Sequence, residues 1–277
     1  MRSWFSGLGK TVAPVVISGV LVAACQTVQT TQGGAVGVDR KQSMMVSAAD
    51  VDKAAAANYQ QVLGESKKKG ALNADVAQTE RVRGIARRLI PQVAVFREDA
   101  LKWNWEVNVI ESDELNAWCM PGGKIAFYSG IIEKLKLTDD EIAAIMGHEM
   151  AHALREHARE RASKAMAAGI GVQVVGAVAG LGDIGTQLTS VLADITFVKP
   201  NSRLHETESD RIGIELAARA GYDPRAAVGL WKKMSENGGG QPPQWLSTHP
   251  SHETRIKDIE KYAARVMPLY EKARGKS

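Results

Sequence analysis

Two histidines four residues apart, with a glutamate directly after the first, stand in the segment GHEMAHALREH at 147–157. In a helix, residues i and i+4 project from the same side, so His148 and His152 can hold one metal ion. This is the spacing of His-Glu-x-x-His zinc sites, in which Glu149 is the base for zinc-bound water and not a ligand. Zinc lowers the pKa of that water to about 7, so a carboxylate can complete its deprotonation. The motif predicts one zinc ion per chain.

A catalytic zinc site needs a third protein ligand, and the sequence offers two candidates. His157 is one, but an astacin-like pattern would require glycine and histidine where Arg155 and Ala158 stand, so we expect His157 to be a solvated helix residue. The other is SRLHETESDRIGIELAARA, where Glu206 and Asp210 share one helical face. Glu206 can bind zinc while Asp210 accepts the outer N–H of a ligand histidine and fixes its tautomer. A charged solvent face is the alternative, but the two motifs complete each other.

The helices that must position these residues can be placed from capping and periodicity. Thr138 and Glu141 form a capping box that starts the histidine helix. Apolar residues at three- and four-residue steps predict helices over 49–65 and 76–101. From 129 onward, the pattern is helical almost throughout.

Three short alternating runs, WNWEVNVI, LNAWCM and KIAFYSG, predict a small β-sheet. The turn Pro121-Gly122-Gly123 joins the last two runs. The sequence shows no internal repeat and no second domain. We therefore predict a single α+β domain over 49–277.

The apolar stretch at 165–181 has two interpretations. Gly176 and Gly180 have the small-xxx-small spacing of a membrane-inserted helix. The stretch is slightly short for a membrane span and contains Gln173. We favour a buried or membrane-grazing helix beside the motif helix.

The N-terminal sequence predicts export. Residues 1–24 have a positive start and an apolar run, which indicates a signal peptide. Val22-Ala23-Ala24-Cys25 resembles the bacterial lipobox, so we expect lipid on Cys25, although a plain signal peptide that happens to contain this cysteine is the alternative. Residues 25–48 are rich in Gln, Thr and Gly and predict a lipidated flexible tether. Gln at position 26 favours the outer membrane of a Gram-negative bacterium, on its periplasmic side.

Charge and cysteine content exclude other classes. Without the first 24 residues, 33 basic residues face 31 acidic ones, so the charge gives no evidence for a nucleic-acid partner. Cys119 has no recognisable His-and-acid arrangement around it, and we expect a small apolar strand residue and not a nucleophile. A zinc deaminase would need Pro-Cys-x-x-Cys, which is absent.

Four segments carry a family resemblance: NAWCMPGGKIAFYSGII, LTDDEIAAIMGHEMAHALREH, HETESDRIGIELAARAGYDP and STHPSHETRI. They resemble the zinc metallopeptidases that include the CAAX prenyl protease and HtpX, which form metallopeptidase family forty-eight, and within it the periplasmic BepA-like branch. Most of 75–265 is covered, and the tetratricopeptide repeats that BepA-like proteins often carry are not recognisable. The resemblance implies that the zinc ligands are His148, His152 and Glu206, that Glu149 is the catalytic base, and that Asp210 supports a ligand.

The resemblance also implies a fold and a function. The fold would be a gluzincin-like zincin, mainly helical with a small sheet above the active-site helix. The activity would be endopeptidase cleavage of misfolded or misassembled cell-envelope proteins, with outer-membrane assembly machinery as a candidate partner. The alternative is a lipid-anchored chaperone or assembly scaffold with little proteolysis.

Substrate would bind as an added strand along the exposed edge of the sheet. The candidate edge consists of Asn116, Ala117, Trp118, Cys119 and Met120. An ordinary hairpin is the alternative for this segment. Trp118 would line a specificity pocket or belong to the core.

His249 in Ser-Thr-His-Pro is a candidate regulatory ligand. A loop with Gly238-Gly239-Gly240 at its start precedes it, and the position matches the one where BepA-like peptidases carry a histidine able to reach the zinc. We expect His249 to occupy the open fourth position and inhibit the resting enzyme. The alternatives are a transition-state stabiliser and a bystander.

Overall fold

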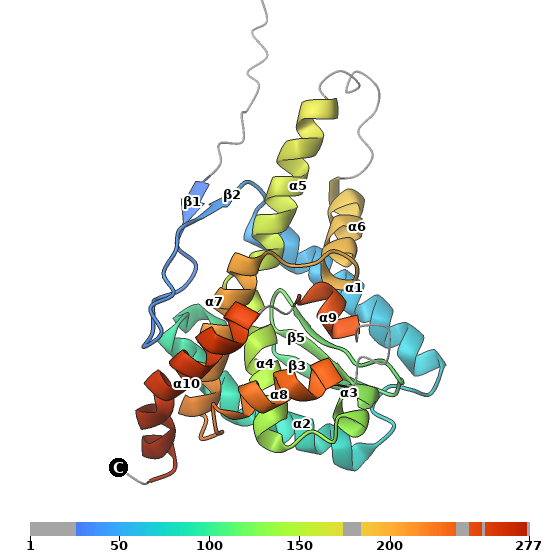
Figure 1. Cartoon of the computed structure of the whole chain (residues 1–277). Coiled ribbons are helices and arrows are strands. Elements are labelled where there is room, and N and C mark those ends of the chain that lie inside the picture. Colours follow the sequence, from blue (N-terminus) through green and yellow to red (C-terminus); the bar gives the residue numbers. More distant parts are fainter. Residues whose placement is uncertain (1–25, 174–183, 237–243, 251–252, 276–277) are drawn as a thin grey trace, which may run out of the picture.

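A computed structural model describes residues 26–173, 184–236, 244–250 and 253–275. The motif helix, α4 (Asp139–Leu154), lies in the interior, with a small sheet on one side and helices on the others (Figure 1). Helices dominate and the strands are few and short. The predicted α+β fold, mainly helical with a small sheet beside the motif helix, is confirmed.

The sheet beside α4 has three strands: β3 (Glu106–Ile110), β4 (Ala117–Met120) and β5 (Lys124–Tyr128). Their order is β3-β5-β4, with β3 parallel and β4 antiparallel to β5. Gly122 and Gly123 form the β4–β5 turn with φ of 74° and 77°, a backbone region in which only glycine is free of strain. β4 therefore lies at one edge of this sheet and packs against α4.

The start of α4 is fixed by its own residues. The Thr138 side chain accepts from the Glu141 N–H, and the Glu141 carboxylate accepts from the Thr138 N–H at 2.8 Å. The predicted capping box is therefore confirmed, and it satisfies amides that would otherwise lack partners at the helix start. Ile142, Ile145 and Met146 behind it are fully buried.

Two glycines allow α4 to touch α7 (Arg203–Arg219) closely. A Cβ on Gly147 would lie 2.6 Å from the carbonyl oxygen of Gly213, and a Cβ on Gly213 would lie 2.6 Å from the amide nitrogen of His148. No larger residue fits at either position without moving the backbones apart. The contact places the carboxylates of α7 opposite the histidines of α4.

The other helices surround this pair. The α-helices are α1 (Ala48–Lys68), α2 (Val76–Leu89), α3 (Ser129–Lys134), α5 (His157–Gln173), α6 (Ile184–Phe197), α8 (Ala226–Glu236), α9 (Gln244–Thr248) and α10 (Glu253–Ala273). The helix predicted over 76–101 instead ends at Leu89 and continues as the 3-10 turns Ile90–Val95 and Glu98–Lys102. Pro91 explains the break, because it has no N–H for a helical hydrogen bond.

Several predictions lie wholly or partly outside the described residues. The signal peptide at 1–24, the lipidated Cys25 and the loop start at Gly238-Gly239-Gly240 lie outside, as does the second half of the apolar stretch at 165–181. The first half belongs to α5, which projects with α6 from the rest of the domain (Figure 1). Within the described ranges, no helix has both the length and the apolar character of a membrane span.

Residues 26–47 differ from the flexible tether expected for 25–48. β1 (Gln26–Val28) pairs with β2 (Gln42–Met44), and Val36 and Met44 are each 1% exposed. The amides of Ala35 and Val36 donate to the Glu215 carboxylate at 3.0 and 2.9 Å. The polar composition suggested a tether, but the few apolar residues within it are buried against the domain. The segment is part of the folded domain.

Candidate metal centre

Four side chains bring one donor atom each within 4.8 Å of one another. His148 and His152 come from α4, Glu206 comes from the first turn of α7, and His249 directly follows α9. The structure therefore brings together the three predicted zinc ligands and the predicted fourth ligand.

The donor distances fit a zinc ion. Donors about 2.0–2.1 Å from a tetrahedral zinc stand about 3.3 Å from one another. His148 Nε2 lies 3.1 Å from His152 Nε2 and 3.2 Å from His249 Nδ1. Glu206 Oε1 lies 3.3 Å from His152 Nε2 and 3.0 Å from His249 Nδ1. These nitrogen and oxygen donors suit zinc both in type and in spacing.

The predicted support by Asp210 matches the geometry. Its Oδ1 lies 2.9 Å from His148 Nδ1, the nitrogen that faces away from the donor cluster. The sequence did not point to Arg255, which donates two hydrogen bonds to Asp210 at 2.7 and 2.8 Å. Arg255 Nη1 also lies 2.8 Å from Glu206 Oε2, in an ion pair without hydrogen-bond geometry. Arg255 thus holds the orientation of both carboxylates.

Glu149 lies beside the donor cluster and is 3% exposed. The indole N–H of Trp245 donates to Glu149 Oε1 at 2.8 Å, and His249 Nε2 lies 3.4 Å from the same oxygen. Trp245 and His249 stack with ring centroids 4.7 Å apart. The short helix α9 therefore places one residue on the carboxylate and one on the donor cluster. Trp245 carried no sequence signal of this role.

His157 is not the solvated residue that we expected. It is 1% exposed, and its Nδ1 lies 2.9 Å from His152 Nδ1. It lies on the outer side of His152, so it is not a third ligand either. The astacin-like pattern predicts only whether a histidine is a metal ligand. It gives no information on a histidine that contacts the outer nitrogen of a ligand, as His157 does.

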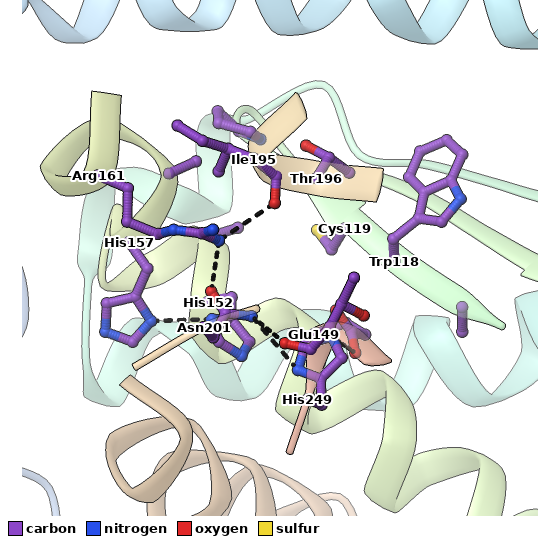
Figure 2. Close-up of a pocket in the computed structure, with 15 residues that line it drawn as sticks. Trp118, Cys119, Glu149, His152, His157, Arg161, Ile195, Thr196, Asn201 and His249 are labelled. Atoms are coloured by element: carbon purple, nitrogen blue, oxygen red, sulfur yellow. Dashed lines mark hydrogen bonds and ion pairs between the residues drawn. The ribbon is translucent and has the colours of Figure 1, made fainter. Parts of the chain in front are cut away.

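A cavity opens onto the donor cluster (Figure 2). Ala117, Trp118 and Cys119 of β4 line it together with Glu149 and His152. The Trp118 ring points away from Glu149 (Figure 2) and packs edge-to-face with neighbouring aromatic rings. Trp118 is therefore mainly a core residue.

Four of the five residues of the predicted edge segment are buried, and Cys119 is partly exposed. Asn116 and Met120 do not line the cavity and are 7% and 2% exposed. Burial, with a smaller effect of Glu149, raises the pKa of the Cys119 thiol well above its usual range. Cys119 therefore stays protonated, as expected for a residue that is not a nucleophile.

Protons compete with metal at this centre. Burial disfavours the charged ring of His148, but the hydrogen bond with Asp210 and the nearby Glu206 carboxylate outweigh burial and raise its pKa to about 9. Burial likewise disfavours charge on Glu206, but His249 and the neighbouring rings of His148 and His152 hold its pKa well below the usual range. In the metal-free protein the carboxylate is ready to bind zinc, whereas His148 must first release a proton.

Zinc binding is therefore expected to strengthen with rising pH. Between pH 6.5 and 8.5, the apparent zinc affinity should increase about tenfold per pH unit for the proton released from His148. Competition with a chromophoric chelator at several pH values measures this slope, after correction for the chelator's own protonation. A flat profile over this range would show that His148 is not protonated in the metal-free protein.

Comparison with known proteins identifies mitochondrial and bacterial relatives. The chain is 34% identical over 180 residues to the mitochondrial metalloendopeptidase OMA1 of Bos taurus, which covers 61% of this chain and 34% of that protein. It is 37% identical over 180 residues to mitochondrial metalloendopeptidase OMA1 of Schizosaccharomyces pombe, covering 64% of this chain and 52% of that protein. The beta-barrel assembly-enhancing protease of Escherichia coli is 26% identical over 208 residues, covering 70% and 41%. The chain thus spans about a third to about half the length of these relatives.

These relatives correct the predicted localisation. We expected a lipid-anchored protein in the periplasm of a Gram-negative bacterium, but the mitochondrial relatives are 32% to 37% identical and the bacterial one only 26%. The prediction of a periplasmic, outer-membrane location is therefore wrong. An apolar run with a positive start and four lipobox-like residues is too short a pattern to identify a compartment. The specific placement in the BepA-like branch is likewise not supported over relatives of the OMA1 type.

The family itself is identified by the core of the domain. The model of Peptidase family M48 matches residues 76–263, which include the motif helix, α7 and His249. This span contains all four donors and Glu149. The predicted zinc-metallopeptidase family is therefore confirmed, and zinc is the metal on which these peptidases depend. The chain belongs to peptidase family M48.

Proposed function

We propose that the chain is a zinc endopeptidase in which His148, His152 and Glu206 hold the metal and Glu149 is the catalytic base. One observation carries this proposal: the Glu149 carboxylate borders the same cavity as His152 and His249 of the donor set, in which four donor–donor distances are 3.0 to 3.3 Å. A bound zinc ion supplies Lewis-acid chemistry, which polarises the scissile carbonyl and makes water more acidic.

Glu149 would move the protons of the reaction. It accepts a proton from the attacking water and then donates it to the leaving amine, which is general acid–base catalysis. The Trp245 N–H holds Oε1 of the carboxylate, so Oε2 is the oxygen available for the proton. Asp210, fixed by Arg255, would hold His148 in the tautomer that presents Nε2 to the metal.

Substrate would bind as an extra strand along β4. The Tyr128 N–H donates to the Asn116 carbonyl, so residue 116 and alternate residues after it face β5. Ala117 and Cys119 therefore direct their backbone groups to the side of β4 that does not face β5, and both residues line the same cavity as Glu149. Asn116 Oδ1 accepts from the Ala117 N–H at 2.9 Å, and a bound strand would replace this contact. Backbone pairing of this kind gives affinity with little sequence preference.

Low sequence preference suits misfolded or misassembled proteins as the substrate class. The name of the Escherichia coli relative, a beta-barrel assembly-enhancing protease, supports a role in protein assembly, and the envelope origin of substrates rests on that relative at 26% identity. A scaffold without proteolysis would not need Glu149 beside the donor set.

Metal removal tests the proposed activity. The purified chain should cleave casein, lose this activity on dialysis against a zinc chelator, and recover it when one equivalent of zinc is returned. Gel electrophoresis of the digest measures the cleavage. A zinc-loaded chain that leaves casein intact, even at long incubation and high enzyme concentration, would contradict the proposal.

We further propose that His249 occupies the fourth metal position at rest and inhibits the enzyme. Its Nδ1 lies 3.2 Å from His148 Nε2, and Asn201 anchors the end of α9 by donating to the Thr248 carbonyl at 2.9 Å. Four protein ligands close a zinc site, and a catalytic site needs one open position. Substrate binding would then have to displace α9.

Replacing His249 with alanine should therefore activate the enzyme and leave zinc bound. If the closed state is favoured by about 1.4 kcal/mol, removing it should raise the rate of casein hydrolysis about tenfold. Ser247→Ala, a change at an exposed residue of the same helix, is the control and should leave the rate unchanged. A His249→Ala enzyme that keeps zinc but loses activity would identify His249 as a transition-state stabiliser, and an unchanged rate would make it a bystander.

A further inference from the structure

The two histidines of α4 differ in the group that contacts their outer nitrogen, Nδ1, which faces away from the donor cluster. The outer nitrogen of His148 faces a carboxylate, that of Asp210, at 2.9 Å. The outer nitrogen of His152 instead faces another imidazole, since its Nδ1 lies 2.9 Å from Nδ1 of His157. A neutral imidazole has one donor nitrogen and one acceptor nitrogen, so one of these two nitrogens must carry the proton and the other must not.

The position of His152 in the donor cluster decides which nitrogen carries the proton. Its Nε2 faces His148 and Glu206, so this nitrogen must be free of a proton to bind metal. The proton of His152 therefore lies on Nδ1 and is donated to Nδ1 of His157. The proton of His157 then lies on Nε2, which is 3.0 Å from Glu208 Oε2.

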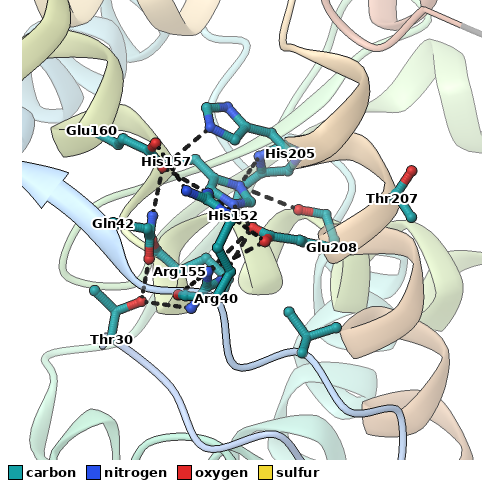
Figure 3. Close-up of polar contacts among 12 residues, drawn as sticks. Thr30, Arg40, Gln42, His152, Arg155, His157, Glu160, His205, Thr207 and Glu208 are labelled. Carbon is teal, nitrogen blue, oxygen red and sulfur yellow. Dashed lines mark hydrogen bonds and ion pairs between the residues drawn. The ribbon is translucent and has the colours of Figure 1, made fainter. Parts of the chain in front are cut away.

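The carboxylate at the end of this chain is firmly held. Glu208 is 5% exposed and accepts from Arg40 Nε at 2.8 Å and from Arg155 Nε at 3.3 Å (Figure 3). Arg155 is fully buried. Arg40 lies in the N-terminal segment that packs on the domain, so this segment completes the surroundings of Glu208. The carboxylate cannot turn away from His157 without breaking these ion pairs.

His157 itself has little freedom to move. It is 1% exposed, and its ring stacks on that of His205 with centroids 4.2 Å apart and planes 14° apart. The ring has a carboxylate on one nitrogen and His152 on the other. A ring fixed on three sides can hold its neighbour in one orientation.

We propose that His157 and Glu208 are positioning residues that orient the metal ligand His152 through a directed hydrogen-bond chain. Glu208 fixes the tautomer of His157, and His157 fixes the tautomer and the ring angle of His152. The inference rests on the proposed zinc centre and adds to it a second support, at the other ligand histidine of α4.

Zinc affinity of the full chain tests this inference. His157→Leu removes the acceptor, and loss of such a support typically weakens metal binding by 10- to 100-fold. His157→Asn restores an acceptor oxygen close to the position of Nδ1, so its zinc dissociation constant should return to within about threefold of wild type, below the 10- to 100-fold loss expected without the acceptor. Competition with a chromophoric chelator measures the constants, and the visible spectrum of the cobalt-substituted proteins should shift only for His157→Leu.

Asn58→Leu is the matched control. Asn58 of α1 is buried, and its side chain donates to the Thr189 carbonyl of α6 at 2.9 Å, so this change also replaces a buried polar side chain with leucine. Its replacement should lower the melting temperature of the metal-free protein without changing the zinc dissociation constant. A purely structural role for His157 would make the two sites behave alike.

The outcomes separate this inference from the proposed function. Wild-type affinity in His157→Leu would overturn it, and so would equal weakening in His157→Leu, His157→Asn and Asn58→Leu. If His157→Leu does not fold, Glu208→Gln replaces it, with weakened zinc binding expected and unchanged binding contradicting the inference. A wild-type chain that binds no zinc would instead refute the proposed function itself.

Discussion

Glu149→Gln is expected to abolish detectable casein hydrolysis while leaving one zinc ion per chain. The amide has nearly the shape of the carboxylate and can still accept the Trp245 hydrogen bond, so the site should keep its geometry. It cannot accept a proton from water, and the loss of a general base typically slows a reaction by about 10²- to 10⁴-fold. Initial rates and the zinc content of the same samples give both quantities.

The matched control for this substitution is Glu260→Gln, at an exposed position of α10. It makes the same chemical change far from any proposed role, so both activity and zinc should remain at wild-type values. A Glu149→Gln enzyme with wild-type activity would refute the assignment of the base. An inactive variant that has also lost its zinc would show that Glu149 holds the metal.

Glu206→Gln is expected to remove both the metal and the activity. Glu206 is 1% exposed, and its Oε1 is among the four donor atoms. A neutral amide is a weaker ligand than a carboxylate, and the change also removes the negative charge between two histidines. Zinc affinity should fall by more than about 100-fold, beyond the loss typical of a residue that only supports a ligand.

Asp210→Asn gives the comparison for Glu206→Gln. Asp210 lies one turn further along α7 and contacts the outer nitrogen of His148, so the loss should be about 10- to 100-fold. Chelator competition on both variants orders the two effects. Full zinc occupancy in Glu206→Gln under competition would contradict its assignment as a ligand.

The motif helix and its ligands could be predicted because their signals are local. The spacing of His148, Glu149 and His152 and the capping box at Thr138 each lie within a few residues of sequence. Glu206 could be assigned to the same site because a catalytic zinc ion needs a third protein ligand. The small sheet was predictable from alternation and from the glycine turn after β4.

The surroundings of the centre could not be predicted in the same way, because they depend on long-range contacts. Trp245 is an ordinary helix residue in sequence, and only the packing of α9 brings it to the base. His157 follows His152 by five residues, but α4 ends at Leu154 and α5 begins at His157, and the turn through Glu156, with φ of 50°, brings its ring to the ligand. The close contact between Gly147 and Gly213 could not be predicted, because neither glycine indicates its partner in the sequence. Residues 26–47 have the composition of a tether, and their burial depends on the domain to which they bind.

The central claim is that one zinc ion is held by nitrogen and oxygen donors of these side chains, and X-ray absorption at the zinc edge tests it most directly. The zinc-loaded wild-type chain should show four light donors at about 2.0–2.1 Å, three of them imidazoles, and His249→Ala should reduce the imidazoles to two. A sulfur donor at about 2.3 Å, or a shell of oxygen donors without histidine, would contradict the account.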